Sequence, residues 1–451
     1  MGTATRTRHG RTTGRDTGSS RGQRSNDPGR QAPAASVAVQ GAPAATTLRP
    51  LSRTSRIGPV QLRQLLLVEF ALALVAVGFA LGGGLWLVPT GTVAGLLVLL
   101  AVIRRRGHAL PDWLATALAL RARRRGSAPA GPDTDPSLAP VTESLPGFGA
   151  SPFVDRDRRT VGMLGDGTFL TAVVRVEASG SALRPAFGAR ALPLSLLGDA
   201  LEVDDIVMES VQLVQQVRAA PAPHLPQQSV ARLSYAPLQE KTGAPALRMT
   251  WIAVKLDPEL CPEAVAARGG GMEGAQRCLV RVADHVASRM TGAGFQAVVL
   301  DQEELNSTVA TAACASPRAA SRAGRPDAAP QRRTAETSRV WRCDDRWHTS
   351  YAVGRWPELG RAATPLPKLV SLLTAVPAYA TTISLTVRRG TRQGTMDIGG
   401  HVRITGGSDT ELIGVRRALE QAARGAKVGL LRLDREQLPG VLATMPLGGA
   451  R

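Results

Sequence analysis

The chain has 451 residues, with 55 lysines and arginines against 36 aspartates and glutamates, so its formal net charge at pH 7 is +19. Such an excess suggests nucleic acid, but residues 1–63 carry +9 and residues 104–125 carry +6, whereas residues 126–451 carry only about +5. Aromatic residues, which would stack on unpaired bases, make up only 4% of the chain. Composition therefore predicts no nucleic-acid partner and favours basic segments that lie next to a membrane.

The first segment, residues 1–56, has no aromatic residue and is rich in Arg, Thr, Ser, Gly, Ala and Pro. A segment of this kind cannot bury enough apolar surface to offset the entropy of the chain. It is predicted to be a disordered, Arg-rich tail.

An uncharged run of 34 residues then extends from Phe70 to Ile103. As one helix it would be about 51 Å long, whereas the hydrocarbon layer of a membrane is about 30 Å thick. Glycines at 82–84 and Pro89 interrupt the run. The sequence thus predicts a transmembrane hairpin over residues 57–106, with spans at about 65–83 and 86–103. The alternative is a helical hairpin buried in a globular domain, which is disfavoured because soluble helices rarely lack a polar face over this length.

Both flanks of the hairpin are strongly basic, which predicts a multi-pass protein of the cytoplasmic membrane with both termini in the cytoplasm. We expect Arg104, Arg105 and Arg106 at the membrane interface, near anionic lipid headgroups. Residues 107–125 are predicted to form an amphipathic juxtamembrane helix that places Trp113 at the same interface.

Small residues in the two spans, among them Gly78, Gly91 and Gly95, are expected to allow close helix packing. Two readings stay open: the spans pack only against each other, or they also receive helices of another subunit.

Residues 126–148 read as a linker, and residues 149–451 as a cytoplasmic α+β domain with a mixed sheet. The clearest local signal is a pair of β-branched runs joined across Asp166 and Gly167, which predicts a hairpin. Residues 315–338 contain no large aliphatic or aromatic side chain and are predicted to be a disordered insertion.

A search for chemistry is mostly negative. The sequence has no phosphate-binding GxxxxGK[ST] motif, no zinc-ligand spacing among its four cysteines and six histidines, and no GxSxG. We therefore predict no catalytic residues, no cofactor and no metal. The doublet Asp344 and Asp345 is the acidic pair least easily dismissed as ordinary surface charge.

Several features in order resemble a known family: the basic tail, the hairpin ending in IRRRG, a PDWL segment, DGTFLTAVVRVE and a terminal ATMPLGG. Together, over residues 57–451, they resemble EccE, a membrane component of the type VII (ESX) secretion systems of actinobacteria. The resemblance implies a subunit of the secretion translocon in the cytoplasmic membrane, with EccB, EccC and EccD as partners and no catalytic residues.

Two functional hypotheses follow. The first is a non-enzymatic structural subunit of the type VII translocon. The second is a membrane-tethered enzyme acting on a sugar-nucleotide or lipid substrate, which rests on fold analogy alone.

Overall fold

The computed structural model describes residues 56–57, 60–80, 84–102, 104–105, 108–131, 134–145, 147–178, 191–218, 247–325, 327–357, 365–392 and 394–449, with a few residues between 226 and 237. The expected disordered tail over residues 1–56 lies outside these residues, apart from Arg56.

The N-terminal part of the described chain contains two helices that pack against each other, α1 (Leu62–Ala80) and α2 (Gly84–Val102). Short antiparallel pairs flank them: β1 (Arg56–Ile57) with β2 (Val60–Gln61), and β3 (Arg104–Arg105) with β4 (His108–Ala109). Helix α3 (Leu110–Gly126) follows, as predicted for residues 107–125. Among the described residues, no helix combines the length and apolar character needed to span a membrane.

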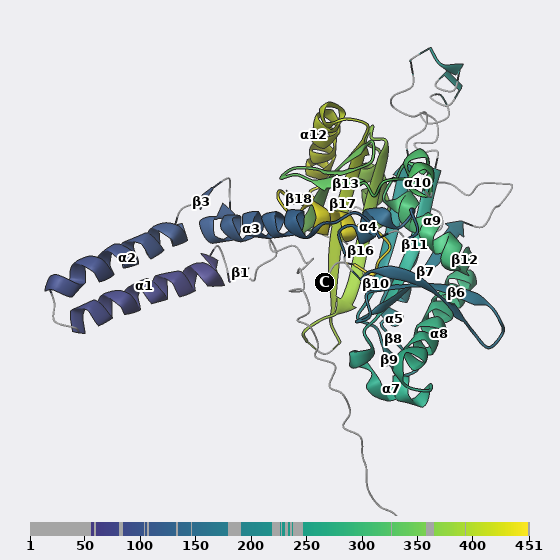
Figure 1. The fold of residues 1–451 in the computed structure, drawn as a ribbon, viewed down its shortest axis with the longest axis horizontal. Coiled ribbons are helices and arrows are strands. Elements are labelled where there is room, and N and C mark those ends of the chain that lie inside the picture. Colours follow the sequence, from purple (N-terminus) through teal and green to yellow (C-terminus); the bar gives the residue numbers. More distant parts are fainter. Residues whose placement is uncertain are drawn as a thin grey trace, which may run out of the picture. The chain divides into compact units, whose positions relative to one another are not determined.

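The rest of the chain is built on a sheet of 12 strands (Figure 1). Its main path is β13-β14-β15-β17-β16-β10-β11-β7-β6-β5, while β12 pairs with β7 and β18 pairs with β15. Every described pairing is antiparallel, so the α+β class is confirmed and the predicted mixed sheet is wrong. The physical reason is that strands joined through a long helix, β11 to β12 and β17 to β18, have an oppositely directed strand between them.

Most of the sheet comes from two units with the same βαββαβ connection, the ferredoxin-like arrangement. The first unit has the strand order β10-β11-β7-β12, and the second has β16-β17-β15-β18. The first consists of β7 (Leu170–Ala178), α5 (Ser195–Asp199), β10 (Ser210–Arg218), β11 (Leu247–Leu256), α8 (Gly271–Gly292) and β12 (Phe295–Val299). The second consists of β15 (Arg346–Arg355), α11 (Leu366–Thr374), β16 (Ala380–Arg389), β17 (Met396–Gly406), α12 (Asp409–Gly425) and β18 (Gly429–Arg432).

The two units share one sheet because β10 pairs with β16, from Val211 opposite Val387 to Val217 opposite Thr381. We call this pairing the seam. The remaining elements extend or cover the sheet: α4 (Ala139–Thr142), β5 (Gly149–Val154), β6 (Thr160–Gly165), β8 (Glu202–Val203), β9 (Ile206–Val207), the 3-10 helix Pro258–Leu260, α7 (Pro262–Ala267), α9 (Gln302–Ala312), α10 (Pro317–Ala323), β13 (Thr334–Glu336), β14 (Trp341–Cys343) and α13 (Gln437–Leu442).

The hairpin predicted across Asp166 and Gly167 is confirmed and joins β6 to β7. Gly167 has φ of 91°, a conformation that favours glycine. The Asp166 carboxylate accepts hydrogen bonds from the Thr168 amide at 2.9 Å and from its hydroxyl at 2.6 Å.

Apolar cores lie on both faces of the sheet. Helices α5 and α8 cover the first unit on one face (Figure 1), and α11 and α12 cover the second. On the other face the core includes residues of α4, α9, α13 and the chain after α13. Leu138, Val141 and Phe148 belong to this core, so the predicted linker over residues 126–148 is wrong in its second half.

The predicted disordered insertion over residues 315–338 is also wrong, because these residues contain α10 and β13. The composition was misleading for a physical reason. This segment is ordered largely by buried polar contacts of Arg333, Thr334 and Glu336 rather than by large apolar side chains.

The seam is closed on one face by the C-terminal residues 443–449. The amide nitrogen of buried Gln212 donates to Ser384 Oγ across the seam at 2.8 Å and to the Ala443 carbonyl at 2.9 Å, while its oxygen accepts from the Gly448 amide at 2.9 Å. Gly448 and Gly449 have φ of 83° and 89°. A Cβ at Gly448 would lie 2.5 Å from that of Lys255, which explains glycine here.

We therefore predict that Gln212→Leu lowers the free energy of unfolding by about 2–4 kcal/mol, because Ser384 of the second unit and the Ala443 carbonyl and Gly448 amide of the C-terminal segment lose this partner. The control is Gln215→Leu on the same strand, whose half-buried amide donates only to Thr250 Oγ1. This control is expected to change stability by less than about 1 kcal/mol. Guanidinium unfolding of the detergent-solubilised chain measures both, and equal effects would contradict the role given to Gln212.

Candidate functional site: the junction between helix α3 and the sheet

Helix α3 has two distinct sides. Thr116, Leu120 and Arg123 are buried, whereas Leu114 and Leu118 are 42% and 66% exposed. This division follows from the helical period, because residues three or four apart share a side. The buried side fixes the end of α3 to the outer edge of the second unit, where it contacts β13.

The centre of this contact is a buried ion pair. Arg123 Nε donates to Glu336 Oε2 at 3.0 Å and Arg123 Nη2 donates to Glu336 Oε1 at 3.1 Å, and both side chains are only 4% exposed. Arg123 Nη2 also donates to the Arg435 carbonyl at 2.6 Å. The two parallel hydrogen bonds fix the direction as well as the distance of the contact.

Glu336 also joins further parts of the chain. Its Oε1 accepts the Leu438 amide of α13 at 3.0 Å, and its carbonyl accepts Arg124 Nε at 2.8 Å. One residue of β13 thus connects α3 with α13. The Arg435 guanidinium lies 4.6 Å from the centre of the Trp113 ring, which adds a cation–π contact at the other end of α3.

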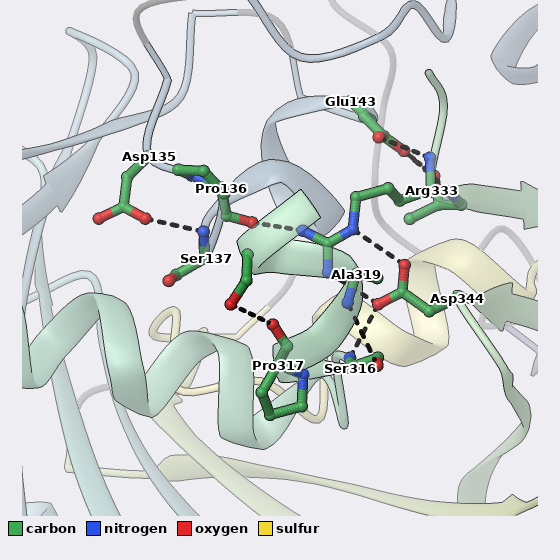
Figure 2. Close-up of polar contacts among 11 residues, drawn as sticks. Asp135, Pro136, Ser137, Glu143, Ser316, Pro317, Ala319, Arg333 and Asp344 are labelled. Atoms are coloured by element: carbon green, nitrogen blue, oxygen red, sulfur yellow. Dashed lines mark hydrogen bonds and ion pairs between the residues drawn. The ribbon is translucent and has the colours of Figure 1, made fainter. Parts of the chain in front are cut away.

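A second buried ion pair holds β13 from its other end (Figure 2). Arg333 Nε donates to Asp344 Oδ1 at 2.9 Å and Nη2 donates to Oδ2 at 2.7 Å, with side chains 7% and 6% exposed. Arg333 Nη1 reaches the Pro136 carbonyl, and Asp344 Oδ2 accepts the Ser316 amide just before α10.

Glu143 completes this network after α4. Its carboxylate accepts the amides of Arg333 and Thr334 at 2.8 and 2.9 Å and the Thr334 hydroxyl at 2.6 Å (Figure 2). Burial raises the pKa of Glu143, while the Thr334 hydroxyl and the two amides act to lower it. For Arg333, burial lowers the pKa and the Asp344 carboxylate raises it, with a net rise. The contacts keep Arg333 charged and paired.

The predicted membrane-interface residues are only partly described. Trp113 is half-buried in α3. Arg104 and Arg105 form β3, but their side chains lie outside the description, as does the whole of Arg106. The junction brings Trp113 close to Arg435, a pairing that the sequence did not indicate.

The three glycines of the helical hairpin differ in surroundings. Gly78 is buried, and a Cβ there would collide with Thr90 of α2. At Gly91 and Gly95 a Cβ would meet no described atom within 4 Å. Gly78 therefore lies in the contact between α1 and α2, whereas the other two lie on open sides of α2.

The residues considered for a chemical role lie in ion pairs or in the protein interior. Asp344 is paired inside the protein, and Asp345 is exposed, 3.6 Å from Arg346. All four cysteines (Cys261, Cys278, Cys314 and Cys343) are buried and free. Within the described ranges, no group of three or more His, Cys, Asp and Glu could hold a metal ion.

Sequence patterns did not identify the residues that pair with one another at this junction. Arg123, Glu143, Arg333 and Glu336 are ordinary surface residue types, and their partners are up to 213 residues apart. No local spacing indicates such pairs.

The described chain is thus an α+β protein in which two ferredoxin-like units share one antiparallel sheet and a helical N-terminal segment is fixed to an outer edge. Residues 244–353 match the sequence profile of the family described as "EccE: Putative type VII ESX secretion system translocon, EccE". The resemblance read from the sequence is confirmed over these residues.

Other comparisons add little. No curated protein matches the chain. A solved structure of alkyldihydroxyacetonephosphate synthase is similar at 8% identity with a TM-score of 0.24. The alignment covers 60% of this chain and 42% of the synthase, so less than half the length of that relative is spanned. A likeness this weak carries no argument about fold or activity.

We predict that Glu336→Gln lowers the free energy of unfolding by about 3 kcal/mol, because Arg123 then remains buried without a counter-charge. The end of α3 should also become more accessible, which faster trypsin cleavage at residues 121–125 would detect.

Two controls make this test specific. Replacing both partners, Arg123→Met with Glu336→Met, should recover most of the loss, since no lone charge remains. Arg121→Gln removes an exposed arginine of the same helix and should change stability by at most about 0.5 kcal/mol. A double variant no better than Glu336→Gln would contradict the assignment of the loss to an unpaired charge.

Proposed function

We propose that the chain is a non-enzymatic structural subunit of the type VII (ESX) translocon of the cytoplasmic membrane. The observation that carries this proposal is the EccE match over residues 244–353. The proposed partners are EccB, EccC and EccD. The order of features along residues 57–451 supports the same assignment for the parts of the chain outside the match.

The proposed site of membrane attachment is the α1–α2 hairpin, with both termini in the cytoplasm. It is supported by the uncharged run at 70–103 and by the basic flanks. Large apolar side chains on the described parts of both helices also point outward: Phe70, Leu72, Phe79, Val88 and Leu96. Lipid tails or helices of another subunit would cover them.

Helix α3 is proposed to lie at the cytoplasmic membrane surface. Its exposed side carries Leu114 and Leu118 and then Arg121 and Arg125, all within one helical stripe. Apolar residues followed by arginines suit an interface in which the former enter the headgroup region and the latter bind anionic headgroups. Arg104, Arg105, Arg106 and Trp113 are proposed to share this interface.

The role proposed for the junction is mechanical. An α3 helix at the membrane, held to β13 by Arg123 and Glu336, would fix the orientation of the sheet domain relative to the membrane. A scaffold subunit needs such a fixed orientation in order to present its surfaces to neighbouring subunits.

One prediction from this proposal concerns the membrane topology of the chain. Reporter fusions after Arg125 and at the C-terminus should both show cytosolic activity, because both flanks of the hairpin are basic. The four buried cysteines should remain reduced in freshly quenched cells, as expected for this compartment. A periplasmic signal from either fusion, or an intramolecular disulfide, would place the domain on the other side.

A second prediction tests assembly through the hairpin. Gly91→Leu and Gly95→Leu should leave insertion and stability intact but reduce co-purification of EccB, EccC and EccD by about tenfold, because the large side chain would occupy an open side of α2. Gly78→Leu is the contrasting variant, since it disturbs the contact between α1 and α2 itself.

The results for these variants show whether the small residues pack only within the hairpin or also against helices of another subunit. Normal co-purification of the Gly91→Leu and Gly95→Leu variants, with loss only for Gly78→Leu, would mean that the helices pack only against each other. Failure of the wild-type chain to co-purify with any of the three partners after gentle detergent extraction would overturn the proposed function.

A further inference from the structure

The sheet domain carries an unusually basic segment. Residues 317–342 contain seven arginines against Asp327 and Glu336, or +5 in 26 residues, as much as the whole of residues 126–451. The flanking ranges, 126–316 and 343–451, carry −6 and +6 and cancel. This range overlaps residues 315–338, whose composition suggested disorder, and contains α10, β13 and most of β14.

The buried ion pairs determine which charges of this segment reach the surface. Glu336 and Asp344 form buried ion pairs with Arg123 and Arg333, so these carboxylates present no negative charge at the surface. Most of the remaining arginines are exposed. Together with those of α3 they form what we call the basic edge: Arg121, Arg124, Arg125, Arg318, Arg322, Arg325, Arg339 and Arg342.

The same contacts hold the parts of the basic edge together. Glu336 ties the arginine-rich end of α3 to β13, and Arg333 and Asp344 tie β13 to the start of α10 through the Ser316 amide. None of the eight arginines forms an ion pair with a carboxylate among the described residues. Their charge is therefore available to an external anion.

We propose that the basic edge binds the anionic lipid headgroups of the membrane to which the chain is attached, so that the edge of the sheet, and not only α3, contacts the lipid surface. This rests on the membrane attachment proposed above. Among the residues that the structure describes between 317 and 342, no large apolar side chain is exposed that could anchor a protein partner. Arginines spread over a helix, a strand edge and a second helix suit a planar, diffuse array of anions better than a shaped protein surface.

The test uses the full chain in liposomes of phosphatidylcholine alone or mixed with phosphatidylglycerol, with hydrogen exchange measured over residues 317–342. Exchange should slow by about tenfold only when phosphatidylglycerol is present, and high salt should reverse the effect. Arg322→Gln with Arg325→Gln should abolish most of the protection.

A matched control is available on α12. Arg417 and Arg424 are also exposed, and Arg424, like Arg322, lies in the last turn of its helix. Arg417→Gln with Arg424→Gln should leave the lipid-dependent protection unchanged. Equal loss in the control would mean a general charge effect and would overturn the proposal.

Flotation of the same liposomes distinguishes the proposed membrane attachment of the chain from the proposed lipid binding of the basic edge. A chain that floats but exchanges equally with both lipids overturns only the role of the basic edge. A chain that does not float overturns the membrane attachment as well. Protection that appears only after the other translocon subunits are added would identify the edge as a protein interface and overturn lipid binding.

Discussion

The antiparallel pairing of β10 with β16 is the constraint on which the rest of the structure depends. It joins two ferredoxin-like units into one sheet and buries Gln212 and Ser384 at the seam. Polar side chains cannot be buried there without partners. The C-terminal residues 443–449 supply the partners for Gln212, so the last described residues of the chain complete a contact between units that begin far earlier. The two units are therefore coupled through polar groups as well as through the backbone ladder.

Because the seam uses one outer strand of each unit, the opposite edges remain at the ends of the sheet. In the second unit this end is extended by β13 and β14, and short edge strands with charged residues are a usual way of avoiding unwanted strand pairing. In this protein the charged residues of the edge also join it to other parts of the chain. Glu336 and Arg333, in or beside the outermost strand, form buried pairs with α3 and with Asp344, so α3 packs against part of this edge. The same pairs leave the exposed charge of this region positive.

The sequence was informative where the signal is local. The turn at Asp166 and Gly167 and the α+β class both follow from local spacing and periodicity. It failed where order depends on distant partners. Residues 315–338 have too few apolar side chains to fold by burial alone, yet Arg333 and Glu336 find carboxylate and guanidinium partners from other elements. Likewise, Leu138 and Val141 sit in a proline-rich stretch but enter the core. The antiparallel sheet could not be read from connectivity, because helical crossovers can also join parallel neighbours.

Buried ion pairs of this kind are weak evidence for stability, since apolar pairs of similar volume often stabilise as well or better. An ion pair, however, restricts the relative orientation of the two elements that it joins. Two parallel hydrogen bonds between Arg123 and Glu336 are satisfied only in one alignment of α3 against β13, whereas apolar side chains tolerate small rotations. For a scaffold subunit whose helix lies at the membrane, an alignment error in α3 would move every surface of a sheet many strands wide. A geometrically strict pair at this position therefore suits the structural role proposed for the chain.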